Sequence, residues 1–317
     1  MNGRYRSEDG VLARGLARRG LTRLSVAVLL SVALVAVAAA ASFVLPPLVQ
    51  PASSERHAGK VIWADLVTPD LAAAKRFYGA LFGWSFNDIH TGASDYSVAL
   101  LDGRPVGGLY QHALRSGEQR QPAWLTFISV RDVAEAEHSI LAHGGKLLAP
   151  PRLYAERGRQ AVFADPQGAV FAVLQSSSGD PEDVLAAPGE WIWSSVMTRD
   201  PDQDAAFYQN VFGYEVFDMP GEDGTMHIVL SSEDVARASL NPLPAGGAAK
   251  RHPHWLNFVR VTSATDTLAR VESLGGRVLV HPFRDRHGGL VAVVADPAGA
   301  PFGLLEWTDA DSKDTAK

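Results

Sequence analysis

Four tryptophans, each followed two positions later by a polar residue, have the types and spacing that best suggest chemistry in this chain. Residues two apart in a strand point to the same face, so each pair would present an aromatic surface beside a hydrogen-bonding group. Aromatic walls with one or two polar groups suit a planar or amphipathic small molecule. We therefore predict ligand-binding residues at Trp63, Asp65, Trp124, Thr126, Trp193, Ser195, Trp255 and Asn257.

An alternative is that the tryptophans only fill the core, because large aromatics usually pack rather than recognise a ligand. Asp65 argues against this alternative, since a buried carboxylate needs a donor, and it would favour a cationic or hydroxyl-bearing ligand. The chain has no cysteine, no G-x-S-x-G turn and no phosphate loop. Catalytic residues therefore stay unassigned, and we favour a binding protein over an enzyme.

The elements that must position these residues are repeated along the chain. Residues 63–84 have the pattern of a strand, a helix with Thr68 at its N-cap and Pro69 at its first position, and a stop at Gly83. Other landmarks recur at an offset of 130 or 131 residues: Trp63 with Trp193, Phe77-Tyr78 with Phe207-Tyr208, Trp124 with Trp255, Gly144-Gly145 with Gly275-Gly276, and Asp165-Pro166 with Asp296-Pro297. This regularity indicates a duplication.

Each copy again divides into two halves of similar pattern, a strand and a helix followed by about three short strands. We predict an α+β protein of tandem βαβββ modules. One domain spans residues 60–176 and a second spans residues 191–308. Turn formers and acids in residues 177–190 indicate a linker, and residues 309–317 form a polar tail.

The repeated motifs resemble those of a known family. The FY..LFGW helix, the paired glycines, and the closing stretches DPQGAVFAVLQ and DPAGAPFGLLEW look like the vicinal oxygen chelate superfamily. That superfamily includes glyoxalase I, bleomycin-resistance proteins, fosfomycin-resistance enzymes and extradiol dioxygenases. The resemblance covers nearly all of residues 60–308 and implies two domains of curled mixed sheets with flanking helices.

The resemblance also implies where a metal would be held. Metal-dependent members carry ligands on the first strand of a module and seven residues after the aspartate of the closing D-P-x-G. Those positions hold Trp63 and Ala172 in one copy and Trp193 and Gly303 in the other, none of which offers a suitable donor. We therefore predict no metal cofactor. The resemblance implies that Trp63 and Trp193 point into the concave face where the ion would lie, and we expect Trp124 and Trp255, which begin the partner strands, to lie near the same cavities.

A divalent metal in the second copy is the alternative, with Asn257 as a weak oxygen ligand. Neutral imidazole is the commonest metal ligand, so the histidines matter. Their spacing matches no strong zinc or iron motif: His252, His254, His281 and His287.

The N-terminus has a membrane-type pattern. Residues 1–23 are arginine-rich, and the uncharged run Leu24–Leu45 is long enough to cross a hydrocarbon core of about 30 Å. By the positive-inside rule, we expect a cytoplasmic segment 1–23, a single-pass signal anchor 24–45, a linker 46–59 and extracytoplasmic domains at the cell membrane. The alternative is cleavage near Ser42 and secretion.

A net charge of −6 and a pI near 5.9 argue against a nucleic-acid partner. The combined prediction is a membrane-anchored, glyoxalase/bleomycin-resistance-like protein that binds a small organic molecule without metal. Two alternatives stay open: a metal-dependent lyase or dioxygenase with displaced ligands, and a partner-binding module of the cell envelope. Exposed closing strands could also support a homodimer.

Overall fold

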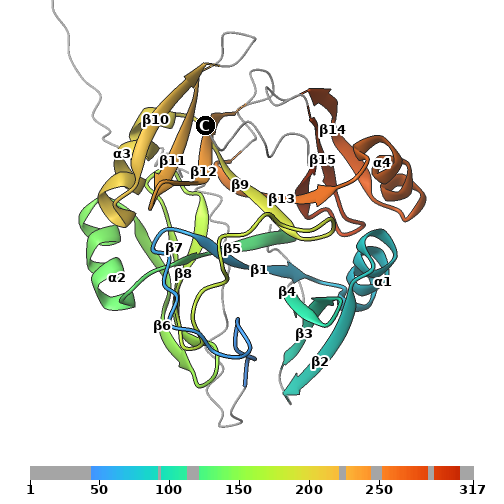
Figure 1. Ribbon diagram of the computed structural model, residues 1–317, viewed down its shortest axis with the longest axis horizontal. Coiled ribbons are helices and arrows are strands. Elements are labelled where there is room, and N and C mark those ends of the chain that lie inside the picture. Colours follow the sequence, from blue (N-terminus) through green and yellow to red (C-terminus); the bar gives the residue numbers. More distant parts are fainter. Residues whose placement is uncertain are drawn as a thin grey trace, which may run out of the picture.

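The chain forms two domains of the same architecture, one above the other in Figure 1. The computed structural model describes residues 44–91, 94–112, 121–220, 226–243, 252–284 and 289–307. The first domain contains, in chain order, β1 (Val61–Thr68), α1 (Leu71–Phe82), β2 (Ser85–Thr91), β3 (Ser94–Leu101), β4 (Arg104–Gln111), β5 (Ala123–Ser129), α2 (Val133–Ala142), β6 (Lys146–Tyr154), β7 (Gly158–Ala164) and β8 (Val170–Ser176).

The second domain repeats this order. It contains β9 (Trp191–Thr198), α3 (Pro201–Phe212), β10 (Glu215–Pro220), β11 (Met226–Ser232), β12 (Val235–Pro242), β13 (His254–Val261), α4 (Ala264–Ser273), β14 (Arg277–Arg284), β15 (Leu290–Ala295) and β16 (Pro301–Glu306). The duplication and the tandem βαβββ modules are therefore confirmed.

Each domain has one eight-stranded mixed sheet. The strand orders are β2-β3-β4-β1-β5-β8-β7-β6 and β10-β11-β12-β9-β13-β16-β15-β14. The first strand of each module pairs in parallel with its last, as β1 does with β4, and the two modules join through the antiparallel pair β1 and β5. The two module-opening strands therefore lie at the centre of each sheet, where the candidate residues are.

Local sequence signals explain where the helices begin and end. The Asp200 side chain accepts from Gln203 N at 3.1 Å, so α3 begins at Pro201. For α1 the prediction was wrong by two residues. Asp70, not Thr68, is the N-cap, with its carboxylate accepting from Ala73 N at 2.8 Å.

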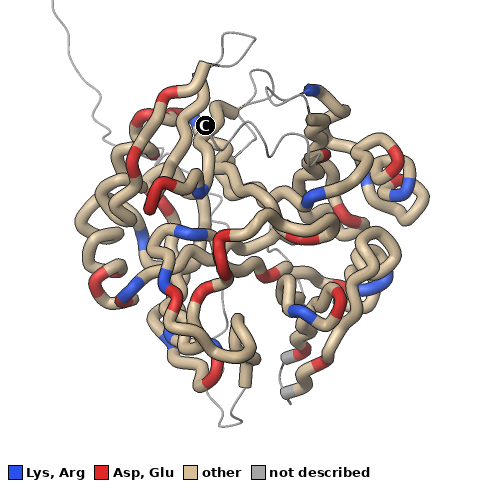
Figure 2. Tube along the Cα trace, in the orientation of Figure 1, with Lys and Arg blue, Asp and Glu red and all other residues tan. Residues whose placement is uncertain are grey.

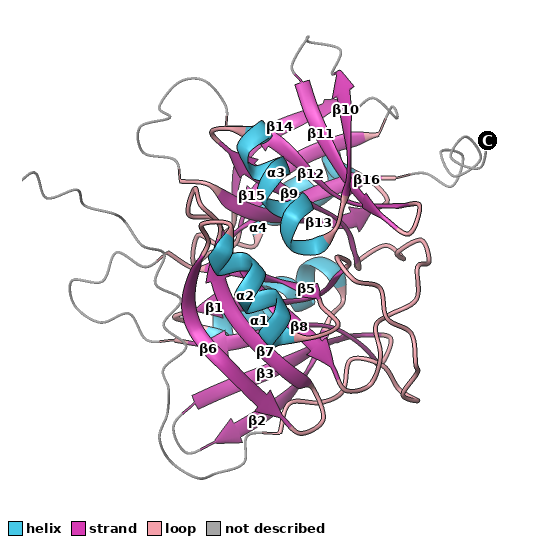
Figure 3. Cartoon of the chain, turned by 90° about the vertical axis from the view of Figure 1, so that its left-hand side faces the viewer, coloured by secondary structure: helices cyan, strands magenta, loops and turns pink. Residues whose placement is uncertain are grey.

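The helices lie between the two sheets, as Figure 3 shows. Helix α1 packs beside α4, and α2 beside α3, so each of the two apolar cores between the sheets contains residues of both domains. Phe77 of α1, for example, has its ring centroid 6.2 Å from that of Phe302 in β16. The helix-bearing face of each sheet is thereby buried against the other domain, and the concave face points away from it.

The predicted membrane segment lies mostly outside the described residues, which begin at residue 44. Leu45, its last residue, is only 3% exposed and belongs to the apolar cluster on the concave face of the first domain. The last residue of the predicted segment therefore packs against the first domain. No helix in the described part of the chain is both long and apolar enough to cross a membrane.

Candidate functional site

The predicted pairs of tryptophans do not share a cavity. Across β1 and β5, Trp63 lies opposite Phe127, whereas Trp124 lies opposite Leu66. Residues opposite each other share a face, and Leu66 and Trp63 are three apart in one strand. Trp63 is therefore on the concave face and Trp124 is on the helix-bearing face, contrary to the prediction.

Trp124 takes part in a hydrogen-bond relay between the domains. Its Nε1 donates to the Tyr78 hydroxyl at 2.9 Å, and that hydroxyl lies 3.4 Å from Asp296 Oδ2 of the second domain. Burial, followed by the charge of Asp296, raises the pKa of Tyr78 well above its ordinary value. These side chains hold the domains together and lie away from either concave face.

The second copy repeats the relay in the opposite direction. Trp255 Nε1 donates to the Tyr208 hydroxyl at 3.0 Å, and Tyr208 donates to Asp165 Oδ2 of the first domain at 3.0 Å. The D-P-x-G aspartate of each domain therefore accepts from the tyrosine of the other. This gives the FY and D-P-x-G motifs a shared structural role.

Thr126 and Asn257 also lie at the interface between the domains. The Thr126 hydroxyl donates to Asn257 Oδ1 at 3.1 Å, and Ser194 Oγ donates to the same oxygen at 2.7 Å. Thr126 and Asn257 are both buried on the helix-bearing faces. The structure therefore places half of the predicted residues between the domains: Trp124, Thr126, Trp255 and Asn257.

Trp63 and Asp65 do lie together on the concave face of the first domain. Asp65 Oδ1 accepts from Trp63 Nε1 at 2.7 Å and from the Tyr96 hydroxyl at 2.8 Å. Burial raises the pKa of Asp65, and the nearby charge of Arg157 opposes the rise. A Cβ at Gly108 would lie 1.9 Å from the Tyr96 hydroxyl, so only glycine leaves room for this group.

On the concave face of the second domain, a hydrogen-bond chain runs across three strands. Ser239 Oγ accepts from Trp193 Nε1 and from Asn241 Nδ2, each at 3.1 Å, and lies 2.8 Å from Ser195 Oγ. Asn241 Oδ1 lies 2.7 Å from His227 Nδ1. Since the amide nitrogen donates to Ser239, the amide oxygen accepts from Nδ1–H, which leaves Nε2 of a neutral His227 as an acceptor.

The two concave faces differ in how far they are covered. Trp63 and Tyr96 of the first domain are 5% and 2% exposed. Their counterparts in the second domain, Trp193 and His227, are half-buried.

The second face also carries a more exposed apolar border. Phe217 lies opposite Val229 and is 49% exposed, and Phe283 lies opposite Val291 and is 51% exposed. Around Trp193, further half-buried apolar side chains pack on the sheet: Ile192, Met197, Val291, Val293 and Trp307. The second domain therefore offers an aromatic and apolar surface with polar groups at its base.

Sequence reasoning missed three members of this group: His227, Ser239 and Asn241. Each stands 131 residues after a residue at the same sheet position in the first domain: Tyr96, Gly108 and Tyr110. The repeat offset could have located them. Matching by residue type could not, because the paired residues differ in chemistry.

The closing-strand positions implied by the family resemblance do face the concave side. Ala172 lies opposite Phe127, and Gly303 lies opposite Phe258. A Cβ at Gly303 would lie 1.9 Å from the Phe258 ring, so the aromatic ring fills the space that a ligating side chain would need. Neither Ala172 nor Gly303 therefore offers a side chain that could ligate a metal ion.

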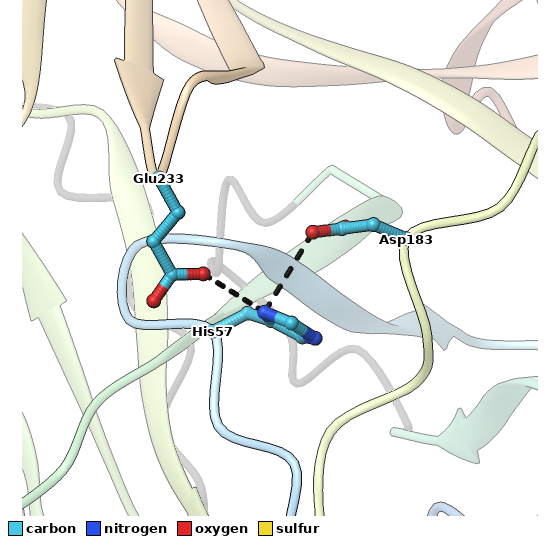
Figure 4. Close-up of side chains that lie close together, drawn as sticks. All are labelled: His57, Asp183 and Glu233. Carbon is cyan, nitrogen blue, oxygen red and sulfur yellow. Dashed lines mark hydrogen bonds and ion pairs between the residues drawn. The ribbon is translucent and has the colours of Figure 1, made fainter.

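Among the described residues, one group of His, Asp or Glu has the spacing to enclose an ion: His57, Asp183 and Glu233 (Figure 4). Lys60 and Arg237 already form ion pairs with the two carboxylates of this group. Asp183 Oδ1 lies 2.7 Å from Lys60 Nζ and 2.6 Å from Arg237 Nη1.

Glu233 Oε2 lies 3.2 Å from Arg237 Nη2. Despite partial burial, the hydrogen bonds and charges of Arg237 and Lys60 lower the pKa of Asp183 to about 2. The group is therefore an ion-pair network that ties the interdomain linker and the β11–β12 turn to the start of the first domain. Figure 2 shows acidic and basic residues similarly interspersed along both domains.

The other histidines considered as ligands form no such group in the described ranges. His254 Nδ1 lies 2.8 Å from the His252 carbonyl oxygen, and His281 is exposed. His287 lies outside the described residues.

Comparison with known proteins agrees with the fold. The family model described as the glyoxalase/bleomycin resistance protein/dioxygenase superfamily matches residues 60–173 and 192–304. The chain belongs to this superfamily. The resemblance inferred from the motifs is therefore confirmed.

Two named relatives are similar over most of their length. "Putative glyoxylase CFP32" of Mycobacterium tuberculosis is 31% identical over 258 residues, covering 81% of this chain and 98% of the relative. The anthracycline biosynthesis protein DauV of a Streptomyces species is 31% identical over 264 residues, covering 80% and 94%.

Solved structures share the fold at low identity. The Mn(II)-bound glyoxalase from Novosphingobium aromaticivorans has a TM-score of 0.56 at 17% identity, covering 79% of this chain and 83% of that one. The 2,3-dioxygenase LapB from Pseudomonas sp. KL28 has a TM-score of 0.55 at 15% identity, covering 80% and 93%.

Proposed function

We propose that this chain binds a planar or amphipathic small organic molecule on the concave face of the second domain, without a metal ion held by the protein. The observation that carries the proposal is the half-buried Trp193 among exposed apolar side chains, held by Ser239 at its indole N–H. A fixed aromatic surface with apolar neighbours and a few polar groups is typical of small-molecule sites.

The polar groups of this face restrict the ligand. Ser195 and Ser239 are buried beneath the surface and fix Trp193 and Asn241. Asn241 in turn orients the half-buried His227 through Nδ1, so that Nε2 of the neutral ring is left to accept a hydrogen bond from a ligand. The preferred ligand therefore combines a flat apolar body with a hydroxyl or amine that donates to His227.

The names of the relatives suggest a first probe. One relative in Streptomyces sp. (strain C5) and another in Streptomyces peucetius are named anthracycline biosynthesis proteins. An anthracycline has a planar ring system with hydroxyl groups, which matches the ligand class deduced from the second face.

A titration of the full chain with an anthracycline, followed by ligand fluorescence, tests the proposal. We expect Trp193→Ala to weaken binding by about tenfold or more, because stacking area and a rigid wall are both lost. Leu153→Ala is the matched control, since Leu153 is an exposed apolar residue of the other domain. Equal affinities for wild type and Trp193→Ala would contradict the proposal.

A metal-dependent enzyme is the second candidate. It is favoured by the hydrogen bond of His227 Nδ1 to Asn241, which leaves Nε2 as a potential metal ligand, and by structural similarity to a Mn(II)-bound glyoxalase. Against it, the described side chains that continue the hydrogen-bond chain from His227 are one amide and two hydroxyls, with no carboxylate among them. Such a set binds divalent metals weakly.

A further inference from the structure

The concave face of the first domain is occupied by the chain itself. Residues 44–50 run beneath the sheet, in blue at the bottom of Figure 1, and bury Leu45 and Leu48 to 3% and 7% exposure. Ser178 Oγ accepts from the backbone N–H groups of Leu48 and Val49 at 2.9 and 3.1 Å. This segment joins the apolar cluster that contains Trp63, Leu125 and Val162.

A buried arginine under this segment has two terminal nitrogens without a hydrogen-bond partner among the described residues. Arg157, in the turn between β6 and β7, has no exposed surface, and its guanidinium carbon lies 4.1 Å from the centre of the Trp63 ring. Its Nε donates to the Pro46 carbonyl oxygen at 2.8 Å. Neither Nη1 nor Nη2 has a hydrogen-bond partner among the described residues.

The nearby acid compensates this charge only in part. Asp65 Oδ1 is already used by Trp63 and Tyr96, and burial raises the pKa of its carboxyl, so that its negative charge is less stable than that of an exposed aspartate. A buried guanidinium normally has its N–H groups paired with an anion or another acceptor. The site therefore has more N–H donors than acceptors among the described residues.

We propose that the concave face of the first domain is a second binding site, for a carboxylate carried on a compact apolar body, and that residues 44–50 occupy it as an internal competitor. A carboxylate can accept from two N–H groups of a guanidinium at once, whereas the Pro46 carbonyl accepts from Nε alone. The apolar body replaces Leu45 and Leu48 in the cluster. This inference does not depend on ligand binding by the second domain.

The test uses benzoate and its neutral analogue benzamide, titrated into the full chain by calorimetry. Leu45→Gly combined with Leu48→Gly weakens docking of the segment without adding charge. We expect this double variant to bind benzoate about tenfold or more tighter than wild type does, with no comparable gain for benzamide. Adding Arg157→Gln removes the gain, while adding Arg152→Gln, which changes an exposed arginine of the same hairpin, leaves it unchanged.

A second variant guards against misfolding of the first. Ser178→Ala removes the acceptor for Leu48 and Val49 while leaving the apolar contacts in place, and it should give a smaller benzoate gain of the same sign. Equal gains for benzoate and benzamide, a gain that survives Arg157→Gln, or no gain in either folded variant would overturn the proposal. The absence of a gain in both folded variants would mean that water alone pairs with the N–H groups of Arg157.

Discussion

Replacing Asp204 with asparagine is expected to raise the free energy of unfolding by about 3 kcal/mol at about pH 8. Asp204 lies in the first turn of α3, has no exposed surface, and neither of its carboxylate oxygens has a hydrogen-bond partner among the described residues. Burial, followed by the charge of Asp165, raises the pKa of Asp204 to about 7. Asparagine has similar shape and carries no charge.

The pH dependence follows from the direction of this shift. An unfolded aspartate titrates near about pH 3.9, so between about pH 4 and 7 the folded protein keeps a proton that the unfolded chain has lost. Stability from this group is therefore full at low pH and falls as the pH rises through that window. The benefit of Asp204→Asn should be much smaller at about pH 5.

Urea unfolding of the wild type and of Asp204→Asn at both pH values checks this expectation. Asp202→Asn is the matched control, because Asp202 lies in the same helical turn but is exposed. An equal effect of Asp204→Asn at the two pH values would show that its charge state is not what limits stability.

Replacing Trp255 with alanine is expected to lower the free energy of unfolding by about 3–5 kcal/mol, in line with truncation of a large buried aromatic. Its indole is 5% exposed, packs at 90° against Tyr208 with centroids 5.5 Å apart, and donates to that hydroxyl. The variant leaves a cavity and removes a donor from the relay to Asp165.

Trp193→Ala is the matched comparison, because this tryptophan lies in the adjacent module of the same domain but stands on the concave face. This replacement should lower the free energy of unfolding by only about 1–2 kcal/mol, because Trp193 is only half-buried and the variant loses mainly the hydrogen bond to Ser239. Urea denaturation of both variants measures the difference. Similar losses would mean that Trp193 is as much a core residue as Trp255.

The module order could be predicted because its signals are local. Caps such as Asp200 and stops such as Gly213 depend on neighbouring residues, and the repeat offset connects the two copies. The placement of Trp63 and Trp124 on opposite faces of the sheet could not be predicted. Alternation fixes faces within one strand, whereas the register between β1 and β5 depends on long-range pairing and includes an irregularity between Val61 and Trp63.

The candidate site was only partly predictable for a similar reason. Trp193 and Ser195 follow from the strand pattern, but His227 joins them only through Asn241 and Ser239 on a neighbouring strand. Leu45 shows a further limit. Burial of an apolar side chain is favourable both in a membrane and against the concave face of a sheet. Hydropathy alone therefore could not predict that Leu45 packs against the first domain.

Native mass spectrometry of the full chain tests the central claim most directly. One sample is incubated with Mn(II) alone, and a second with an anthracycline in the presence of EDTA. We predict no stoichiometric manganese in the first sample and one bound anthracycline in the second, with the adduct lost in Trp193→Ala. One manganese per chain in the first sample, or an anthracycline complex that forms only without EDTA, would contradict metal-free binding at the second domain.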